Sequence, residues 1–307
     1  MSRYVVMGAG ATGLAVAERL VREGSQVRQI TRRGAGLQHP LVERVAADAR
    51  DAERLAGLLE GAETVINCAM PPYDRWITDA PPLAAALLSA VERAGIGYVM
   101  LGNLYAYGHV DGPFTEGLPI APVSAKGRVR AQMWLDALAA FEAGRANVTE
   151  VRAAAFLGAG AVSTFTLSIA PQVLAGEVAK YAGRLDVPQS WSFVGDVAET
   201  LVAAARDGRS WGRAWHVPAA VIPVQELTER FAELTGAPAP RLERLDQDAL
   251  RALSKQNPVF GELVEMLYAT ENPHILDSTE TERMLGVRPT ALDEALLATA
   301  RGLAQVG

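Results

Sequence analysis

The chain has 307 residues, of which 50% are hydrophobic, and its formal net charge is −6 at pH 7. This length is enough for one large α/β domain with a smaller partner lobe. The negative charge and the lack of any lysine or arginine run argue against nucleic acid as the main partner. No apolar stretch reaches the ~18 residues of a membrane span, and no leader precedes the first apolar segment, so we expect no membrane partner. The single cysteine, Cys68, excludes an internal disulfide, and together these features predict a cytoplasmic protein.

The first half of the chain alternates short apolar segments with longer amphipathic ones. Strands are predicted at residues 4–7, 26–31, 42–46, 64–68, 98–101 and 148–154. Helices are predicted at residues 14–22, 51–59, 81–94 and 126–143. Asp51 is expected to cap its helix, and Pro81 is expected in a first turn, where proline is tolerated. Strands separated by such helices predict right-handed βαβ units and a parallel sheet.

The second half of the chain is predicted to be mostly helical. Helices are expected at residues 167–174, 196–205 with Asp196 as the cap, 224–235, 247–254, 259–269, 278–285 and 292–303, with strands at 191–194 and 214–217. The fold class is therefore α/β, with a Rossmann-type doubly wound sheet formed by residues 1–157 and completed by about 190–222. Residues 158–189 and 223–307 are expected to form an interleaved, smaller, mostly helical lobe that binds the substrate.

Three glycines follow the first predicted strand directly. In Gly8-Ala9-Gly10-Ala11-Thr12-Gly13, the glycines lie where a backbone must approach a diphosphate closely, and the following helix begins with free N–H groups. The pattern alone is weak, but its place between an apolar strand and an amphipathic helix strengthens it. The stretch predicts a dinucleotide site formed by Gly8, Gly10, Ala11, Thr12 and Gly13.

The end of the second predicted strand bears on the choice of cofactor. It reads Thr31-Arg32-Arg33, so Thr31 stands where an acidic residue would hold the ribose 2′-hydroxyl of NAD. Guanidinium groups bind a 2′-phosphate well. We therefore expect NADP(H) in preference to NAD(H); the alternative is that both arginines are solvated loop residues.

Further cofactor contacts are expected after the third and fourth strands. Asp48 can accept a hydrogen bond from an adenine amino group, or it can cap a helix. Cys68 and Ala69 offer small side chains over which the cofactor can lie. Cys68 is interpreted as a small buried residue rather than a nucleophile, because no histidine is near it in sequence. The four histidines show no metal-ligand spacing, so no metal site is expected.

Several short segments along the chain form one pattern. They are the glycine motif at 8–13, Ala-Asp-Ala-Arg-Asp at 47–51, Ala-Tyr-Gly at 106–108 with Glu116 and Pro119, and the stretches at 152–160, 193–198 and 285–289. Together they resemble the extended short-chain dehydrogenase/reductase family of the NAD-dependent epimerase/dehydratase type. The resemblance covers nearly the whole chain, and the order and spacing of the segments make it specific.

The resemblance also implies a catalytic set that this chain does not match. The family uses a Ser or Thr after the fifth strand and a Tyr-x-x-x-Lys on the next helix; these positions fall on Asn103, Lys126 and Arg130. Asn103 can still hydrogen-bond a carbonyl. Arg130 can hold a ribose or phosphate oxygen but cannot act as a base at neutral pH. The chain is thus expected to be an atypical member that lacks the Ser/Tyr/Lys set.

Tyr105 and Lys126 are the candidates to replace the missing phenol. Tyr105 follows Asn103 by two residues in a segment expected to be extended, so it should point toward the nicotinamide end. Cations at Lys126 and Arg130 would favour its phenolate. Lys126 is the second candidate, as a desolvated amine. The alternatives are that Tyr105 only packs in the crevice and that Lys126 is a solvated residue at a helix start.

Aromatic residues are expected near the substrate. Residues 70–76 could cover the active site, and an apolar wall could be added by Phe165, Trp191, Phe193 and Tyr268, although aromatic residues also dominate cores. This composition hints at an apolar or ring-containing substrate rather than a nucleotide sugar.

The function expected from the sequence is an NADP(H)-dependent oxidoreductase acting on a small-molecule carbonyl or alcohol, with Asn103 orienting the carbonyl and Tyr105 donating the proton. One alternative is a non-catalytic NADP(H)-binding sensor or regulatory protein. A second is an epimerase or dehydratase with no net redox change. The oligomeric state is expected to be either a monomer or a homodimer. The helices at 81–94 and 126–143 could form the bundle that joins dimers in this family, or they could pack only on their own sheet.

Overall fold

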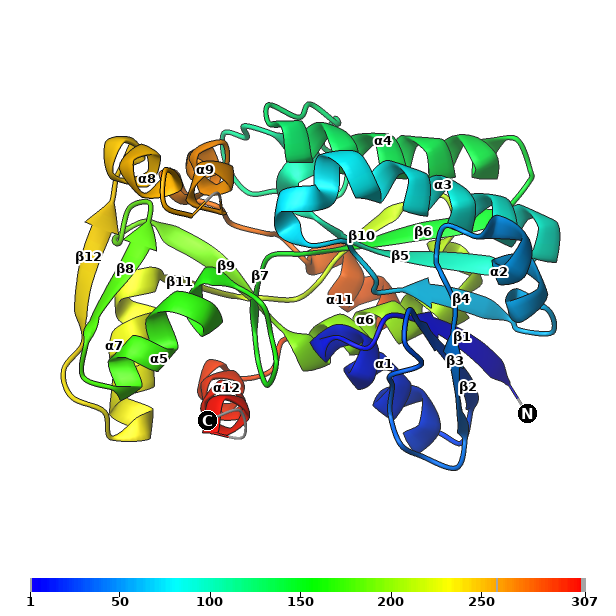
Figure 1. The fold of residues 1–307 in the computed structure, drawn as a ribbon, viewed down its shortest axis with the longest axis horizontal. Helices are drawn as coiled ribbons and strands as arrows, with labels where there is room; N and C mark the ends of the chain where they lie inside the picture. The colour runs from blue at the N-terminus through cyan, green and yellow to red at the C-terminus, as the bar shows by residue number, and fades with distance from the viewer. Residues whose placement is uncertain (1, 258, 305–307) are drawn as a thin grey trace.

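The computed structural model describes residues 2–257 and 259–304. Within these residues a seven-stranded parallel sheet forms the centre, in the order β10-β6-β5-β4-β1-β2-β3 (Figure 1). The strands are β1 (Arg3–Met7), β2 (Gln26–Thr31), β3 (Val42–Ala46), β4 (Thr64–Asn67), β5 (Gly97–Asn103), β6 (Asn147–Ala153) and β10 (Ala214–His216). The predicted fold class, a Rossmann-type parallel sheet, is confirmed.

The strand order reverses beside β1. Met7 at the end of β1 pairs with Ile30 of β2 on one side and with Asn67 of β4 on the other. Ligands of doubly wound sheets bind in the crevice outside the carboxyl ends of the strands at such a reversal. The turn after β1 therefore lies at the place where this architecture binds ligands.

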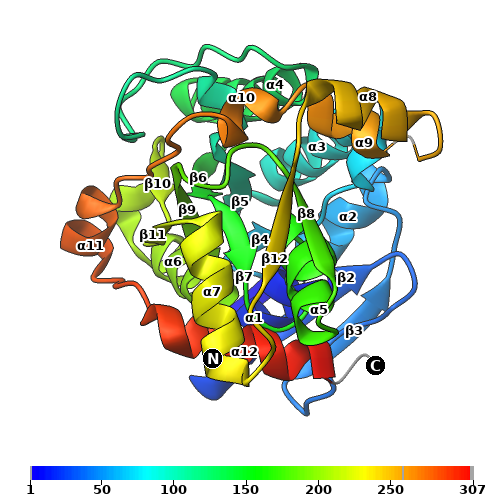
Figure 2. The ribbon, with the colours of Figure 1, turned by 90° about the vertical axis from the view of Figure 1, so that its left-hand side faces the viewer.

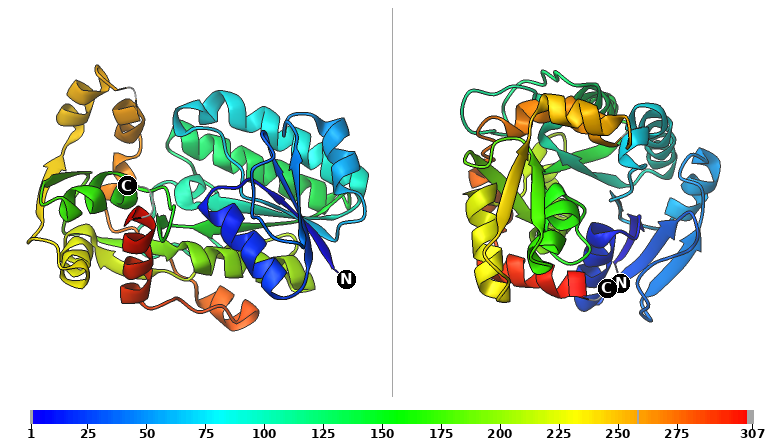
Figure 3. Two further views of the ribbon diagram at one scale, coloured as in Figure 1. Left: turned by 60° about the horizontal axis from the view of Figure 1, so that its bottom comes forward. Right: turned by 60° about the vertical axis from the view of Figure 1, so that its left-hand side comes forward.

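Helices cover both faces of the sheet. On one face lie α2 (Ala52–Leu59), α3 (Trp76–Ala94) and α4 (Ala125–Glu142), and on the other lie α1 (Ala11–Arg22) and α6 (Val194–Arg206) (Figures 1 and 3). Each layer has its own apolar core: Leu55 and Leu87 are fully buried on the first face, and Leu20 and Leu201 on the second. Burial of both sheet faces explains the almost continuous apolar runs in β1 and β4.

A second lobe lies at the carboxyl end of the sheet (Figure 2). Its strands are β7 (Ala155–Leu157), β9 (Pro188–Phe193) and β11 (Ala220–Pro223) in one sheet, and β8 (Val178–Ala182) with β12 (Arg241–Leu245) in another. Its helices are α5 (Ala170–Leu174), α7 (Val224–Thr235), α8 (Gln247–Ser254), α9 (Val259–Val264), α10 (Leu267–Thr270) and α12 (Leu292–Ala304), while α11 (Thr279–Leu285) packs against α6 and β10. Sequence analysis missed β7, β8, β11 and β12.

Two local predictions are wrong. Pro81 does not lie in a first turn, because α3 begins at Trp76, whose side chain is only 9% exposed and anchors the preceding turn. Asp196 does not cap α6, which begins at Val194; its carboxylate instead accepts hydrogen bonds from the backbone N–H (2.8 Å) and the hydroxyl (2.6 Å) of Thr290. Both residues lie inside helices because tertiary contacts start those helices earlier than the local pattern indicates. Among the helices described, none is both long and apolar enough to cross a membrane.

Candidate functional site

The turn between β1 and α1 is tight on its inner side and open on its outer side. Gly8 has φ +99°, a conformation that side chains rarely adopt. A Cβ added to Gly13 would lie 2.5 Å from the carbonyl oxygen of Gly8, so only glycine fits there. A Cβ added to Gly10 would meet no described atom within 4 Å. A ligand can thus approach the backbone closely at Gly10.

The amino end of α1 opens onto the same space. Its first intrahelical bond runs from the N–H of Leu14 to the carbonyl of Gly10, at 2.9 Å. No side chain of the described residues caps this end, so the N–H groups of Ala11, Thr12 and Gly13 keep the positive end of the helix exposed to a ligand. Backbone N–H groups at a helix start suit a diphosphate, so the residues present fit a dinucleotide.

Gln29 holds this turn, and sequence analysis missed it. The residue is fully buried on β2. Its amide nitrogen Nε2 donates to the carbonyls of Gly8 (2.9 Å) and Gly13 (3.3 Å), while Oε1 accepts from the N–H of Leu37 at 2.8 Å. The sequence gives no clear signal for this role, because β2 also contains Gln26, Arg28 and Thr31; only the structure shows that the amide of Gln29 is buried and has found partners.

The two arginines after β2 are solvent-exposed. Within the described part of the chain neither Arg32 nor Arg33 takes part in a salt bridge or a side-chain hydrogen bond, while the hydroxyl of Thr31 donates to the carbonyl of Ala35 at 3.0 Å. Both guanidinium groups are therefore available to a ligand at the end of β2.

Asp48 lies nearby but already has a partner. The Arg50 guanidinium donates to its carboxylate at 2.8 and 3.1 Å, and these bonds, with a smaller contribution from the charge of Arg32, lower the Asp48 pKa to about 2. The helix cap is the neighbouring Asp51, whose side chain accepts from the N–H of Arg54, as predicted. The contact between Asp48 and an adenine stays a prediction.

Cys68 and Ala69 form the floor below the glycine turn. A Cβ on Gly8 would lie 3.2 Å from the N–H nitrogen of Ala69, and one on Gly13 would lie 3.7 Å from the Cβ of Cys68. The buried Asn67 side chain accepts from the Ala69 N–H at 3.0 Å and fixes this strand end. Desolvation raises the Cys68 pKa to about 12, which favours the protonated thiol at neutral pH.

Lys126, in the first turn of α4, is fully buried. Its ammonium group forms ion pairs with the carboxylates of Glu262 and Glu265, the latter at 3.0 Å, and lies 4.5 Å from the ring centroid of Tyr73. The second oxygen of Glu265 accepts from the N–H of Ala125 at 2.8 Å. The alternative that Lys126 is a solvated residue is thus wrong, because carboxylates distant in sequence enclose it.

Arg130 lies one turn later on the same face of α4 and is also buried. It donates to the carbonyl of Leu101 at 3.1 Å, and its guanidinium carbon lies 4.6 Å from the ring centroid of Trp76. Burial lowers its pKa. Its buried Nε has no hydrogen-bond partner among the described residues. Its contact with a ribose or phosphate oxygen stays a prediction.

The segment around Asn103 and Tyr105 differs from the expectation of an extended strand. Asn103 caps a short 3₁₀ helix, Leu104–Tyr107, and its side-chain oxygen accepts from the N–H of Tyr105 at 3.2 Å. The Tyr105 ring is partly exposed and lies 6.2 Å from that of Trp76. The two residues are near each other because of the turn rather than a strand face, and their catalytic roles stay predictions.

The expected aromatic wall is only partly present. Phe165 and Trp191 are buried in the core of the second lobe, with ring centroids 5.9 Å apart, so they form no wall of a cleft. Tyr73, in the turn before α3, lies against Lys126, and Trp76, the first residue of α3, lies against Arg130. That residues 70–76 cover an active site stays a prediction.

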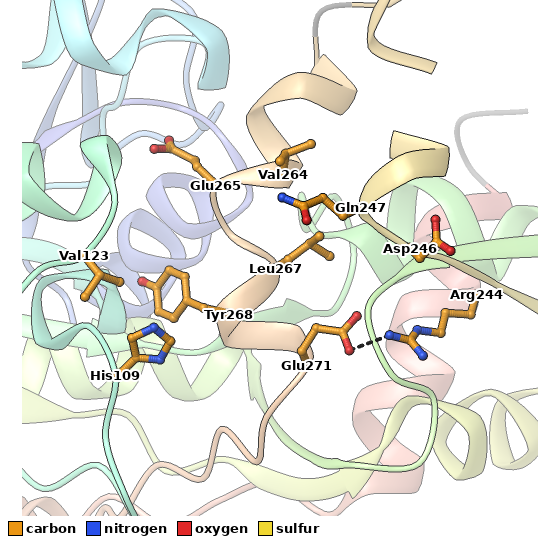
Figure 4. Close-up of a pocket in the computed structure, with 10 residues that line it drawn as sticks. All are labelled: His109, Val123, Arg244, Asp246, Gln247, Val264, Glu265, Leu267, Tyr268 and Glu271. Carbon is orange, nitrogen blue, oxygen red and sulfur yellow. Dashed lines mark hydrogen bonds and ion pairs between the residues drawn. The ribbon is translucent and has the colours of Figure 1, made fainter. Parts of the chain in front are cut away.

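A cavity of about 530 Å³ adjoins this cluster (Figure 4). In it the ring of Tyr268 lies 5.0 Å from that of His109, and Arg244 pairs with Glu271 at 2.7 Å. Glu265 lines the cavity and also contacts Lys126, so this side chain links the cavity wall to the buried amine. The described residues contain no group of three His, Cys, Asp or Glu side chains that could hold a metal ion.

Comparison with known proteins identifies the family. Residues 4–217 match the model of the NAD dependent epimerase/dehydratase family, which is more than half of the chain. The chain belongs to this family. No curated protein matches the sequence significantly.

Solved structures of family members share the fold along the whole chain. MoeE5 in complex with UDP-glucuronic acid and NAD is 20% identical, with a TM-score of 0.81 and coverage of 100% of both chains. UDP-glucuronic acid 4-epimerase from Bacillus cereus, in complex with UDP-glucuronic acid and NAD, is 15% identical with a TM-score of 0.80, covering 99% of this chain and 100% of that one. dTDP-glucose 4,6-dehydratase from Bacillus anthracis, in complex with NAD, is 16% identical with a TM-score of 0.79, covering 99% and 97%. At these identities the likeness establishes the fold alone.

Proposed function

We propose that the protein is an NADP(H)-dependent oxidoreductase that acts on a small-molecule carbonyl or alcohol. The observation that carries this proposal is the glycine turn, where Gly13 has no room for a side chain and Gly10 faces open space at an uncapped helix start. The NAD complexes among the structural neighbours support a nicotinamide dinucleotide. The preference for the phosphorylated form rests on the exposed, unpaired Arg32 and Arg33, together with Thr31 in place of an acid.

The chain's own residues would orient the substrate and move the proton. When bound, the cofactor supplies the hydride chemistry. The amide nitrogen of Asn103 is the proposed donor to the substrate carbonyl, since only its oxygen is engaged, with the N–H of Tyr105. Tyr105 is the proposed proton donor and Lys126 the second candidate, while the buried Arg130 would hold a ribose or phosphate oxygen through its unpartnered Nε.

A second candidate is a non-catalytic NADP(H)-binding sensor, and one observation favours it. The side chain that stands where the family resemblance places the catalytic tyrosine, Lys126, is fully buried between Glu262, Glu265 and Tyr73. A third candidate, an epimerase or dehydratase without net redox change, is supported by the family and by the sugar-nucleotide complexes among the neighbours.

One assay separates the three candidates. The purified protein is incubated with NADPH and a panel of carbonyl compounds and, in parallel, with NADP+ or NAD+ and nucleotide sugars. The absorbance of the reduced cofactor, cofactor binding and product composition are followed together. Loss of NADPH absorbance with a carbonyl substrate supports the oxidoreductase. Binding without any conversion supports the sensor, and conversion of a nucleotide sugar in the presence of oxidised cofactor, without net accumulation of reduced cofactor, supports the epimerase or dehydratase. Failure to bind either NADPH or NADH would contradict all three.

A further inference from the structure

Lys126 is exceptional among the lysines of this chain. The sequence has three lysines, and the other two, Lys180 and Lys255, are exposed. The side chain of Lys126 is 0% exposed. A buried ammonium group loses its hydration and must be compensated by charged or polar partners. The residues that contact the Lys126 ammonium group must therefore supply this compensation.

All of its charged partners come from one short segment. Glu262 lies on α9, and Glu265 follows this helix directly, so both carboxylates reach Lys126 from residues 259–270, which we call the lid segment. Glu265 bridges the Lys126 ammonium (3.0 Å) and the N–H of Ala125 (2.8 Å), which ties the segment to the amino end of α4. Figure 2 shows α8, α9 and α10 lying across the end of the molecule next to α3 and α4.

The apolar side chains of α9 are only partly buried: Phe260, Leu263 and Val264 pack against the small cluster around Leu250. None of its residues is buried; the buried residues of the lid segment are Met266 and Ala269. The side chains of Glu262 and Glu265 are themselves 27% and 26% exposed, so water reaches the carboxylates but not the amine. Segments with few buried apolar contacts open locally at a lower free energy than the core does.

There is space on the other side of the lid segment. Val264, Glu265, Leu267 and Tyr268 line the cavity of about 530 Å³ (Figure 4). The lid segment thus links this cavity to Lys126. On the Lys126 side, the ring of Trp76 lies against Arg130, one turn from Lys126, and 6.2 Å from the ring of Tyr105, just after β5.

We propose that residues 259–270 form a lid, that Glu262 and Glu265 latch it onto Lys126, and that its opening admits the substrate to the carboxyl end of β5. The link to a substrate rests on the proposed function, whereas the latch itself does not. In the closed state the two glutamates satisfy the ammonium group. In the open state Lys126 is exposed one helical turn from Arg130.

Amine acetylation read by peptide mass spectrometry tests the latch without cofactor or substrate. Lys180 and Lys255 are exposed controls within the same chain. In the wild type we expect Lys126 to react much more slowly than either. In the Glu262→Gln/Glu265→Gln double variant, which keeps side-chain shape but removes both charges, we expect Lys126 to react at least about tenfold faster while the two control lysines are unchanged. A matched control, Glu271→Gln, removes the ion pair with Arg244 in the same lobe and should leave Lys126 protected.

Hydrogen exchange distinguishes a latch from a merely structural ion pair. A latch predicts faster exchange in peptides covering residues 259–270 of the double variant, with β1, β4 and β5 unchanged. Faster exchange throughout the chain would overturn the proposal, since it shows global destabilisation. Unchanged protection of Lys126 in the double variant, or a wild-type Lys126 as reactive as Lys180, would overturn it as well. NADPH binding tests the proposed function separately, so the two can fail independently.

Discussion

The two ends of the candidate site use their cationic side chains in opposite ways. At the cofactor end, Arg32 and Arg33 are exposed and, within the described residues, unpaired, and Gly10 faces open space. At the other end, on α4, Lys126 is enclosed by two carboxylates and Arg130 is stacked on Trp76. We call this part of the site, formed by Trp76, Lys126 and Arg130, the packed end. Charges that are free can bind a ligand at once, whereas charges already paired must first be released. The arginines after β2 can therefore meet a ligand directly, whereas the cations on α4 are already held by partners of this chain.

Removing Trp76 should produce the largest effect, because it opens the packed end. Trp76→Ala deletes a nearly buried ring that covers Arg130, so we expect the free energy of unfolding to fall by about 3–5 kcal/mol. Urea denaturation of the variant measures this loss. Ile77→Ala on the same helix is the matched control: its side chain is 52% exposed, and it should change stability by less than about 0.5 kcal/mol. Equal effects of the two substitutions would show that the Trp76 contact contributes little.

A side chain at Gly13 should prevent cofactor binding at the cofactor end. Gly13→Val places atoms against the carbonyl of Gly8, so we expect a loss of about 1–3 kcal/mol of stability together with loss of measurable NADPH binding. Gly10→Ala serves as the contrast, since its methyl group meets no described atom within 4 Å. It should fold with unchanged stability yet bind NADPH more weakly. Unchanged binding by both variants would place the cofactor elsewhere.

The arginines after β2 should affect affinity without affecting the fold. In the Arg32→Ala/Arg33→Ala variant we expect NADPH to bind about ten- to a hundredfold more weakly, because charge-assisted hydrogen bonds to the 2′-phosphate are lost. NADH binding and the melting temperature should stay the same, since neither arginine is paired in the described structure. Parallel fluorescence titrations with the two nucleotides measure the effect, and an equal loss for both would argue against recognition of the 2′-phosphate.

The smallest expected effect is a pH dependence of stability caused by the buried His216 on β10. Burial lowers the pKa of His216 from 6.5 to about 4, and its Nε2 lies 2.8 Å from the hydroxyl of Tyr107. Between these pH values the unfolded chain binds a proton that the folded chain does not, so stability falls as pH decreases from 6.5 toward 4. The slope from this group is about 1 kcal/mol per pH unit. Chemical denaturation at several pH values should show a shallower slope for His216→Gln than for the wild type; identical slopes would contradict the assignment.

Local pattern was enough to predict much of the fold and the cofactor end. The bounds of β2, β3 and α7 agree with the sequence prediction, because short strands with valine and isoleucine between polar residues, and a helix ending at Gly236 in a left-handed conformation, are encoded within a few residues. The geometry of the glycine turn agrees with its motif for the same reason. The polar strands β8 and β12 were missed, because Lys180 and Glu243 interrupt any apolar pattern and the two strands find each other only in the tertiary structure.

The packed end could not be predicted because its partners are distant in sequence. Glu262 and Glu265 lie 136 and 139 positions beyond Lys126, and no local signal links them. The segment from Asn103 to Tyr105, expected to be extended, forms a turn for a different, local reason: the side chain of Asn103 accepts a hydrogen bond from the backbone N–H of Tyr105 and starts a 3₁₀ helix. In such segments a hydrogen bond between a side chain and the backbone determines the local conformation. Hydrophobic periodicity carries no information about such bonds.

The most direct test of the central claim is a pair of equilibrium titrations of the wild-type protein with NADPH and with NADH under the same ionic strength. The account predicts that both nucleotides bind and that NADPH binds at least about tenfold more tightly, because Arg32 and Arg33 can pair with the 2′-phosphate. Binding of NADH as tight as or tighter than that of NADPH would contradict the assignment of the two arginines, and no binding of either nucleotide would contradict the cofactor site itself.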